Sequence, residues 1–403
     1  MRVCFLTSSY PRYAGDMAGI FTARLAQTLE KKGISVHVVA PNDGHYPTED
    51  SIEGVLVHRF SYFLKNHEGL AYGHGGIPAN LSLNPLLFVQ VPFYFLFFFL
   101  KTWHVARQCD LLHVHWAQNL FVGWPVAYLL GKPCVVTLWG SDLRWMERNR
   151  WVYYFTSLLF SGADAVACVT DAARHWLQDR GVAKGKALVI ANGVDTNVFR
   201  PRDKVELRKK LGLTPEAVIL LYVGNLVSYK GVGVLIDALA LMKAAHPLLL
   251  LMGDGDERLN LEEKACQLNL SHRVRFLGAM APDRVPEWMA AADAFVLPSF
   301  TEGRPNVILE AMACGLPVVA TDIPANRDMV MIGKNGLLVP PGDPQALTIA
   351  LDKMVSDSEL RARMGEVARR SIHERQLTWE ECAAKHLELY QNLILHRDMR
   401  CGN

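Results

Sequence analysis

Two glutamates in the second half of the chain have a spacing that suits a phosphate-bearing, polyhydroxylated ligand. Glu302 and Glu310 are separated by seven residues, and an apolar strand is expected to end before them at Leu297. Asn306 is a plausible N-cap and Gly315 a plausible end of the short helix that follows. The free N–H groups of that helix would favour an anion. The alternative is a surface glutamate in a loop followed by a glutamate that caps the helix.

Two loops add groups that phosphate binding needs. In the second half an apolar run ends at Gly224, and Lys230 stands beside the start of the next expected helix. A lysine near exposed backbone N–H groups is typical of a phosphate site, although a solvated loop lysine is equally plausible for this segment alone. In the first half, the loop Ser8–Gly19 leads from the first apolar run to the first helix, where backbone can approach a phosphate.

The elements that must position these residues are expected to form two α/β domains. Short apolar runs alternate with stretches of helical period, which is typical of parallel sheets covered on both faces. The runs are Val3–Thr7, Val36–Ala40, Leu111–His115, Val135–Leu138, Ala165–Val169 and Leu188–Ile190, and then Val218–Val223, Leu248–Met252, Val274–Leu277, Ala294–Leu297 and Val318–Ala320. We predict two facing, doubly wound, Rossmann-like domains with a cleft between them. Their expected limits are 1–198 and 199–375, followed by a C-terminal helix, 376–403, that packs back on the first domain.

Composition excludes several classes of function. The chain has 403 residues, with 42 Lys+Arg against 40 Asp+Glu, and this balance gives no basic face for a nucleic acid. The eight cysteines include no C-x-x-C pair, so we expect no zinc site or disulfide framework and a reducing, cytoplasmic location. The apolar core of the N-terminus is too short for a signal peptide, and we predict a strand there.

The order and spacing of the motifs resemble the GT-B glycosyltransferases, specifically the retaining family 4 group that uses nucleotide sugars. The resemblance covers nearly the whole chain. It rests on the opening strand and glycine loop, Asp110–His115, Val136–Asp142, Ile190–Asp195, Val223–Gly231, Gly253–Glu257, Phe276–Gly278, the pair Glu302 and Glu310, and Asn335–Gly342. It implies transfer of a sugar from a UDP- or GDP-linked donor to a glycan or lipid-linked acceptor, in a bacterial cell-surface polysaccharide pathway. It implies no metal or other cofactor.

The resemblance also assigns roles to individual residues. Glu310 would bind the ribose hydroxyls, Glu302 the hydroxyls of the transferred sugar, and Lys230 the leaving diphosphate. Gly19 would bring its loop against the phosphates, and Gly278 would lie near the base. The remaining donor-binding positions are expected at Gly224, Asn225, Gly303, Arg304, Asn306 and Val307.

Two positions depart from the family pattern. Asn225 stands where the family usually has an arginine, a loss of charge for which Arg304 could compensate. Trp139 stands where many relatives have a histidine, and an indole cannot act as a base. Either Trp139 stacks on a sugar, or the catalytic polar role passes to His115 or Asp142. A histidine with satisfied hydrogen bonds at a strand end is an equally plausible reading of His115.

Asp254 and Asp256 have the spacing of a metal-binding Asp-x-Asp motif. We favour the alternative, a strand-to-helix turn after Leu248–Met252.

The run Leu86–Leu100 is the most unusual feature of the composition. It has fifteen mostly apolar and aromatic residues, and we predict that it does not span a membrane, because a spanning helix needs about 20. A helix lying on an anionic membrane surface is one interpretation, and a helix buried against the first sheet is the other.

The rival functions are a sugar-nucleotide epimerase or phosphorylase, a nucleotide-dependent oxidoreductase, and a non-catalytic sugar-nucleotide-binding homologue. The spacing of Glu302 and Glu310 within the Glu-Gly-Arg-Pro context argues against an epimerase and against a phosphorylase. The absence of a third glycine after Gly231 and Gly233 argues against the oxidoreductase. The departures at Trp139 and Asn225 keep the non-catalytic homologue open.

Overall fold

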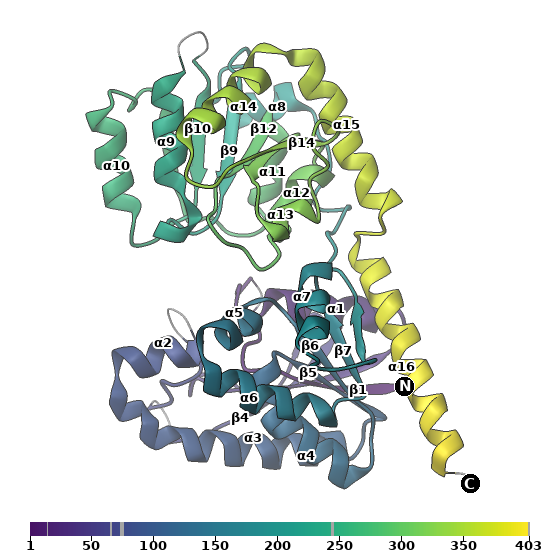
Figure 1. Cartoon of the computed structure of the whole chain (residues 1–403). Helices are drawn as coiled ribbons and strands as arrows, with labels where there is room; N and C mark the ends of the chain where they lie inside the picture. The colour runs from purple at the N-terminus through teal and green to yellow at the C-terminus, as the bar shows by residue number, and fades with distance from the viewer. Residues whose placement is uncertain (14, 65–66, 73–75, 243–245, 402–403) are drawn as a thin grey trace. The chain divides into compact units, whose positions relative to one another are not determined.

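The computed structural model describes residues 1–13, 15–64, 67–72, 76–242 and 246–401 and divides the chain into two compact units (Figure 1). Unit 1 comprises Met1–Ala191 together with Trp379–Asn403, and unit 2 comprises Asn192–Thr378. The divisions therefore fall at 191/192 and 378/379, where the sequence analysis expected 198/199 and 375/376. Each unit is an α/β domain built on a mainly parallel sheet, so the predicted fold class is confirmed.

The sheet of unit 1 has eight strands over the described residues, in the order β3-β4-β2-β1-β5-β6-β7-β8. Every neighbouring pair is parallel except β3 and β4, which the sequence analysis missed because their alternating polarity differs from the buried apolar runs. The strands are β1 (Arg2–Leu6), β2 (Ser35–Pro41), β3 (Glu49–Ile52), β4 (Val55–Phe60), β5 (Leu111–His115), β6 (Cys134–Leu138), β7 (Ala165–Cys168) and β8 (Ala187–Val189).

Helices cover both faces of this sheet. Successive strand residues point to opposite sides, so one strand contributes to the core on each face. Val3 and Phe5 of β1 contribute to one core, whereas Cys4 and Leu6 contribute to the other. The helices and 3₁₀ turns of the unit are α1 (Ile20–Lys31), α2 (Gly76–Leu83), η1 (Pro85–Gln90), α3 (Val91–Ala106), η2 (Ala117–Asn119), α4 (Leu120–Leu130), α5 (Ser141–Arg148), α6 (Arg150–Leu159), η3 (Phe160–Gly162), α7 (Asp171–Asp179) and α16 (Trp379–Cys401).

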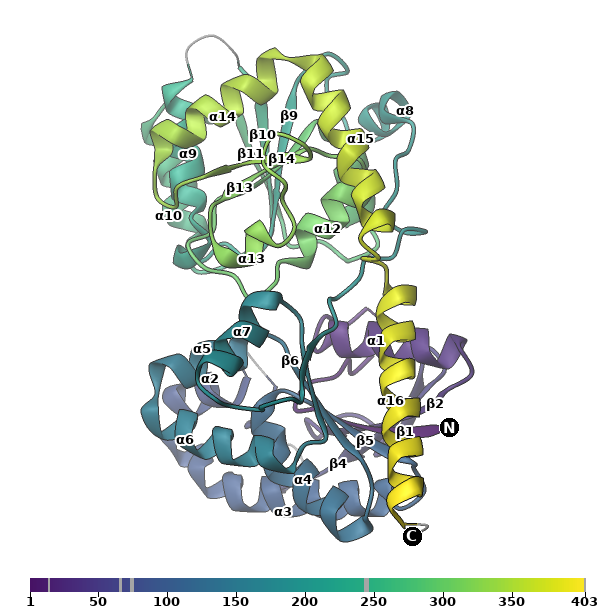
Figure 2. The same cartoon turned by 45° about the vertical axis from the view of Figure 1, so that its right-hand side comes forward.

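The C-terminal helix α16 lies beside α1 and belongs to unit 1, although it follows unit 2 in the chain (Figure 2). Trp379, Ala383 and Tyr390 are buried in the core that α1 shares. The hydroxyl of Tyr390 also lies 2.6 Å from Nδ1 of His113 in the central strand β5. The last helix is therefore fixed to the sheet of unit 1 by both apolar packing and a buried hydrogen bond.

Helix α3, which contains most of the run Leu86–Leu100, packs one side against the sheet of unit 1. Tyr94 and Phe98 point into the core, where Phe98 stacks on Phe60 of β4 at 4.7 Å between ring centroids. The opposite side is exposed. Together η1 and α3 form a continuous apolar helical segment, Pro85–Ala106, whose 22 residues are enough to cross a membrane by length and composition alone. The predicted length limit therefore does not exclude a span, whereas the packing of α3 on the sheet does argue against one.

Unit 2 has six strands over the described residues, in the order β11-β10-β9-β12-β13-β14, and all neighbouring pairs are parallel. The strands are β9 (Ile219–Val223), β10 (Leu248–Met252), β11 (Val274–Gly278), β12 (Ala294–Leu297), β13 (Val318–Thr321) and β14 (Gly336–Val339). The helices are α8 (Lys204–Lys210), η4 (Ser228–Lys230), α9 (Val232–Leu241), α10 (Arg258–Gln267), α11 (Val285–Ala291), α12 (Asn306–Ala313), α13 (Pro324–Arg327), α14 (Pro344–Ser356) and α15 (Ser358–Glu374).

Each sheet has one place where the strand order reverses. In unit 1 it lies between the neighbours β1 and β5, and in unit 2 between the neighbours β9 and β12. Ligands of open α/β sheets bind outside the carboxyl ends of the strands at such a switch point. The loops that leave β1, β5, β9 and β12 are therefore the segments on which a functional site is expected.

Unit 1 should lose stability when the pH falls from about 6.5 to about 4. His113, His115 and His386 are buried, and burial lowers the pKa of each, that of His386 to about 4. The unfolded chain, with histidine pKa values near 6.5, then binds more protons than the folded one. The stability that these neutral rings contribute is therefore present above about pH 6.5 and is lost as pH falls toward 4, with His386 accounting for about 3 kcal/mol.

Urea unfolding followed by tryptophan fluorescence measures this effect, because all tryptophans except Trp288 lie in unit 1. His386→Leu should flatten the dependence of unfolding free energy on pH between 6.5 and 4. The control is the exposed His104→Leu, which should leave the slope unchanged. Equal slopes for His386→Leu and the parent chain would contradict the assignment.

Candidate functional site

Lys230 and Glu302 meet across the switch point of unit 2. Lys230 ends η4 in the loop that follows β9, and Glu302 lies in the loop that follows β12. The ammonium of Lys230 donates to Oε1 of Glu302 at 2.7 Å. The side chains are 18% and 8% exposed, so the pair is largely shielded from water but accessible at its edge. The structure thus brings together a cation and a carboxylate that sequence analysis had identified separately.

A serine and a buried threonine hold the carboxylate loop in place. The hydroxyl of Ser299 donates to Oε1 of Glu302 at 2.6 Å, and Ser299 is fully buried. The hydroxyl of Thr321, at the end of β13, donates to the backbone oxygen of Ser299 at 2.5 Å. Asn326 in turn donates to the backbone oxygen of Thr321 at 2.8 Å. Glu302 is therefore oriented by a chain of hydrogen bonds that ends in the core of unit 2.

Gly231 allows the loop that follows β9 to lie against the loop that follows β12. Its φ is +67°, and a Cβ atom on it would lie 2.2 Å from the backbone oxygen of Pro298. Only glycine is compatible with both the left-handed conformation and this contact. The backbone N–H of Phe300 also donates to the oxygen of Tyr229 at 2.9 Å, which ties the β12 loop to η4.

Helix α12 presents Val307 and Glu310 on its less buried side. These two residues are three positions apart and half-buried, whereas Ile308, Leu309 and Ala311 are buried. Glu310 thus lies one turn inside the helix that begins just after Glu302, as the sequence analysis expected.

The expected N-cap at Asn306 is wrong. Pro305 occupies that position in an extended conformation, and Asn306 is the first helical residue. The side chain of Asn306 accepts a hydrogen bond from the Asn192 amide at 3.2 Å instead of capping the helix. Gly303 and Arg304 lie in the loop immediately before and are half-buried. Gly315, with φ +79°, follows the helix as predicted.

The other predicted donor positions lie along the carboxyl ends of β9 to β11. Gly224 and Asn225 follow β9, and the hydroxyl of Tyr222 fixes this turn by donating to the backbone oxygen of Asn225 at 2.9 Å. Asn225 is exposed. Gly278 ends β11, and its oxygen accepts from the N–H of Gly253 at 2.9 Å.

Asp254, the first residue of the Asp-x-Asp pattern, takes part in a local turn. Its carboxylate accepts from the N–H of Gly255 at 2.9 Å and from the guanidinium of Arg258 at 3.0 Å. The hydrogen bond from Gly255 and then the one from Arg258 lower the pKa of Asp254. These contacts fit the strand-to-helix turn that the sequence analysis favoured.

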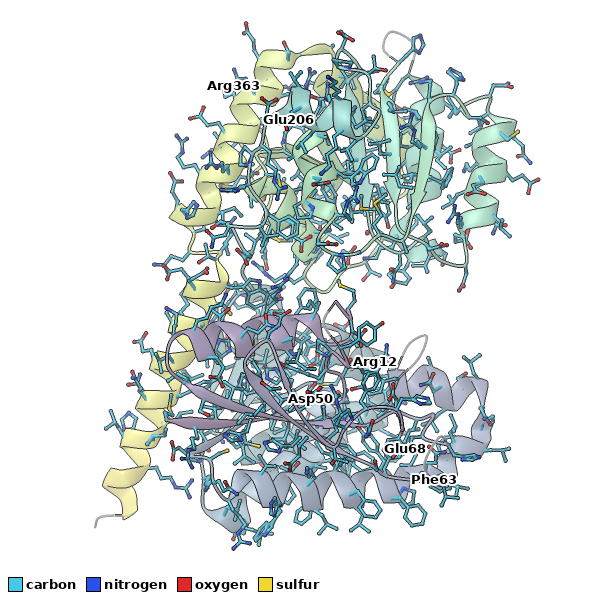
Figure 3. All side chains as sticks on the ribbon, turned by 180° about the vertical axis from the view of Figure 1, so that it is seen from behind. Arg12, Asp50, Phe63, Glu68, Glu206 and Arg363 are labelled. Atoms are coloured by element: carbon cyan, nitrogen blue, oxygen red, sulfur yellow. The ribbon has the colours of Figure 1, made fainter. Side chains whose placement is uncertain are left out.

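In unit 1 the switch point carries the loop that ends at Gly19. Gly19 has φ +62°, and a Cβ atom on it would lie 2.1 Å from the backbone oxygen of Ser9. Within the same loop Arg12, labelled in Figure 3, pairs with Asp16 at 2.7 Å and with Asp43 at 3.3 Å. The loop is thus held closely against itself at the start of α1.

His115 lies beneath Trp139 at the ends of the neighbouring strands β5 and β6. The His115 ring stacks on Trp139 at 5.8 Å between centroids, and Trp139 also stacks on Phe21 of α1 at 6.0 Å. His115 is fully buried, and burial lowers its pKa well below the ordinary value. Among the described protein atoms neither ring nitrogen has a hydrogen-bond partner. Trp139 is the more exposed ring of the pair, and a direct catalytic role of His115 stays a prediction.

Asp142 holds the turn that carries Trp139, and its expected catalytic role stays a prediction. It is buried at the start of α5, where its oxygens accept from the backbone N–H of Gly140 at 2.9 Å and of Trp139 at 3.3 Å. It also accepts from Ala117 at 3.4 Å. Burial raises its pKa, whereas these hydrogen bonds oppose the change. Asp142 therefore positions the turn that carries Trp139, and its carboxylate oxygens accept hydrogen bonds from backbone N–H groups.

Sequence reasoning missed three residues that shape these sites. Ser299 and Thr321 orient Glu302, and Trp116, with φ +65°, packs against Trp139 at 6.1 Å. The position of Ser299 three residues before Glu302 was an available signal. Nothing in the pattern around Thr321 distinguishes it from any other residue that ends a buried strand.

Two family models match the chain over most of its length. The model for Glycosyltransferase Family 4 matches residues 18–198, and that for Glycosyl transferases group 1 matches residues 203–371. A D-inositol 3-phosphate glycosyltransferase of Corynebacterium urealyticum is 36% identical over 70% of this chain and 72% of its own. An N-acetyl-alpha-D-glucosaminyl L-malate synthase of Bacillus anthracis is 26% identical over 98% of this chain and 97% of its own.

The fold is also similar to that of solved structures. Anabaena HepE, solved in complex with UDP and glucose, superposes with a TM-score of 0.76 at 24% identity, over 98% of this chain and 100% of that one. With the two sheets and their switch points, these likenesses establish the predicted GT-B architecture. The chain belongs to the glycosyl transferases group 1 and is a glycosyltransferase.

Proposed function

We propose that this enzyme transfers a hexose or an N-acetylhexosamine from a UDP- or GDP-linked donor to a sugar or lipid-linked acceptor, with retention of anomeric configuration. The ion pair between Lys230 and Glu302 at the switch point of unit 2 is the observation that carries the proposal. The UDP in the HepE complex and the N-acetylglucosaminyl group in the name of the Bacillus anthracis relative support the donor class.

The geometry of the ion pair suits a sugar diphosphate. An ammonium has three donors, so Lys230 can keep Glu302 while it donates to a phosphate oxygen. Both hydrogen bonds to Glu302 within the described residues end on Oε1. The second oxygen, Oε2, is then the acceptor for a sugar hydroxyl. One loop contact would thus couple recognition of the diphosphate to recognition of the sugar, and Glu310 would bind the ribose from the next helical turn.

The chemical step needs positioning and charge stabilisation. The acceptor oxygen forms a bond to the anomeric carbon on the face from which the diphosphate departs. The bond between that carbon and the phosphate oxygen breaks, and the acceptor proton passes to an oxygen of the leaving diphosphate. Lys230 neutralises the charge that develops there, and no metal ion is required. Trp139 is partly exposed at the end of β6, and we expect this exposed part to contact an acceptor sugar.

The setting we propose is bacterial cell-surface polysaccharide synthesis at the cytoplasmic face of the membrane, with contact through Leu86–Leu100. The exposed side of that run favours a lipid-linked acceptor. A small anionic acceptor is the second candidate, because the names of two relatives contain L-malate and D-inositol 3-phosphate.

Removing the cation should slow sugar transfer. A panel of nucleotide sugars is screened by thermal shift and then by turnover, and the donor that binds should raise the melting temperature of the parent chain. Lys230→Ala should lower turnover on the order of 100-fold, which is typical for loss of one group that stabilises developing charge. Glu310→Ala should chiefly weaken donor binding.

Two controls separate this effect from unfolding. Lys210→Ala removes a lysine whose ion pair with Glu287 lies on the surface of the same unit, and activity should be unchanged. Lys230→Met combined with Glu302→Gln removes both charges, so that no buried carboxylate is left unpaired. This double variant should fold like the parent and remain inactive. If the parent chain binds a donor but turns over none of the panel, the non-catalytic homologue is favoured.

The product should keep the anomeric configuration of the donor sugar, and EDTA should leave the rate unchanged. Proton NMR of the first product, before mutarotation or further reaction, gives the configuration through the coupling of the anomeric proton. An inverted product would refute the same-face step. Loss of activity in EDTA, restored by a divalent ion, would refute metal independence without affecting the assignment as a glycosyltransferase.

A further inference from the structure

Three neighbouring helices of unit 1 expose large apolar side chains. We call them the aromatic face: Leu96, Phe97 and Leu100 of α3, Phe121 of α4, and Trp151, Phe155 and Leu158 of α6. Leu100 is 50% exposed and Trp151 is 82% exposed. Single exposed apolar residues are normal on a protein surface, whereas several on adjacent elements indicate a binding surface.

Ring contacts join the three helices into one surface. Phe95 of α3 lies 5.6 Å from Phe121 of α4, and Phe121 stacks on Phe155 of α6 at 5.2 Å between centroids. Both cartoon views show α3, α4 and α6 side by side on the same side of the sheet (Figures 1 and 2). The inner side of α3 is fixed to the sheet by Phe98, so the exposed side is free to meet a partner.

The helices of the aromatic face and their ends carry charges of one sign. Residues 85–107, 117–132 and 150–162, which contain the three helices and their ends, include four Lys or Arg residues and no Asp or Glu. In the whole chain about one residue in ten is acidic, so these roughly fifty residues would ordinarily carry about five. Arg107 and Arg150 are exposed, and Lys101 pairs with Glu49 of β3 at 3.5 Å. The surface therefore favours a negatively charged partner.

We propose that the aromatic face rests on a lipid bilayer that carries anionic lipids. Tryptophan, phenylalanine and leucine beside basic residues are the composition of surfaces that insert into the headgroup region. A second copy of this chain fits less well, because a symmetric contact would place the basic residues of these helices opposite one another, and the helices themselves carry no carboxylate to pair with them. The proposal rests on the membrane contact proposed above and extends it from Leu86–Leu100 to α4 and α6.

Vesicle flotation tests the proposal. The parent chain should float with vesicles of phosphatidylcholine plus phosphatidylglycerol, and more weakly with phosphatidylcholine alone. The α6 variant Trp151→Ser/Phe155→Ser/Leu158→Ser should bind the anionic vesicles at least tenfold more weakly. Arg107→Gln/Arg150→Gln should reduce the preference for anionic lipid. Phe98 is unsuitable for substitution because it is buried in the core.

The matched control is Val205→Ser/Leu259→Ser/Ile349→Ser, which removes three comparably exposed apolar residues, 69–76% exposed, from unit 2. It should float like the parent. The α6 variant should keep the parental far-UV circular dichroism and donor-induced thermal shift, which separates membrane binding from folding and from the proposed activity. Unchanged flotation of the α6 variant would overturn the proposal, as would a parent chain that binds neither vesicle or one that forms a dimer through these residues instead.

Discussion

The ion pair between Lys230 and Glu302 is the contact on which the candidate site of unit 2 depends. A carboxylate that is only 8% exposed is costly unless it is paired and hydrogen-bonded. Here one oxygen receives both the ammonium and the hydroxyl of Ser299, so the cost is offset within two loops. The approach of those loops requires Gly231, because any Cβ there would collide with the oxygen of Pro298. The ion pair therefore depends on both the strand order of unit 2 and the glycine at position 231.

The same constraint explains why the site is poised for a ligand. Lys230 alone would place an uncompensated positive charge near the N-terminus of a helix, and Glu302 alone would be an uncompensated, largely buried negative charge. Together they form a neutral pair that a diphosphate can join by taking some of the lysine's donors, while the carboxylate remains able to accept from a sugar. A ligand that carries both groups satisfies the pair better than either group alone, which is a basis for selecting a sugar diphosphate over a free phosphate.

Most of the fold could be predicted from the sequence, because buried parallel strands are continuous apolar runs that resemble no other element. The β3–β4 pair could not, since β3 is short and largely exposed, β4 alternates buried and less buried residues, and their pairing is antiparallel. The chemistry-bearing residues could be identified, but their partners could not. The contact of Lys230 with Glu302 spans 72 residues, and only the strand order places them together. The burial of His115 and the backbone partners of Asp142 could not be predicted for the same reason, because they depend on the packing of Trp139 and the turn before α5.

Aromatic residues of unit 1 have two different structural settings, one at Trp139 and the other on the aromatic face. At the end of β6 the indole covers a buried, neutral histidine and is held between His115 and Phe21, so its orientation is fixed by packing. On α3, α4 and α6 the exposed aromatic rings have inner neighbours but no outer ones among the described residues, although burying each of them would be favourable by about 1.5 to 3 kcal/mol. A surface that leaves so much stabilisation unused, and that also excludes every carboxylate from its helices, is better explained by an apolar, anionic partner than by the needs of folding. The core already has what it requires from Tyr94 and Phe98 on the opposite side of α3.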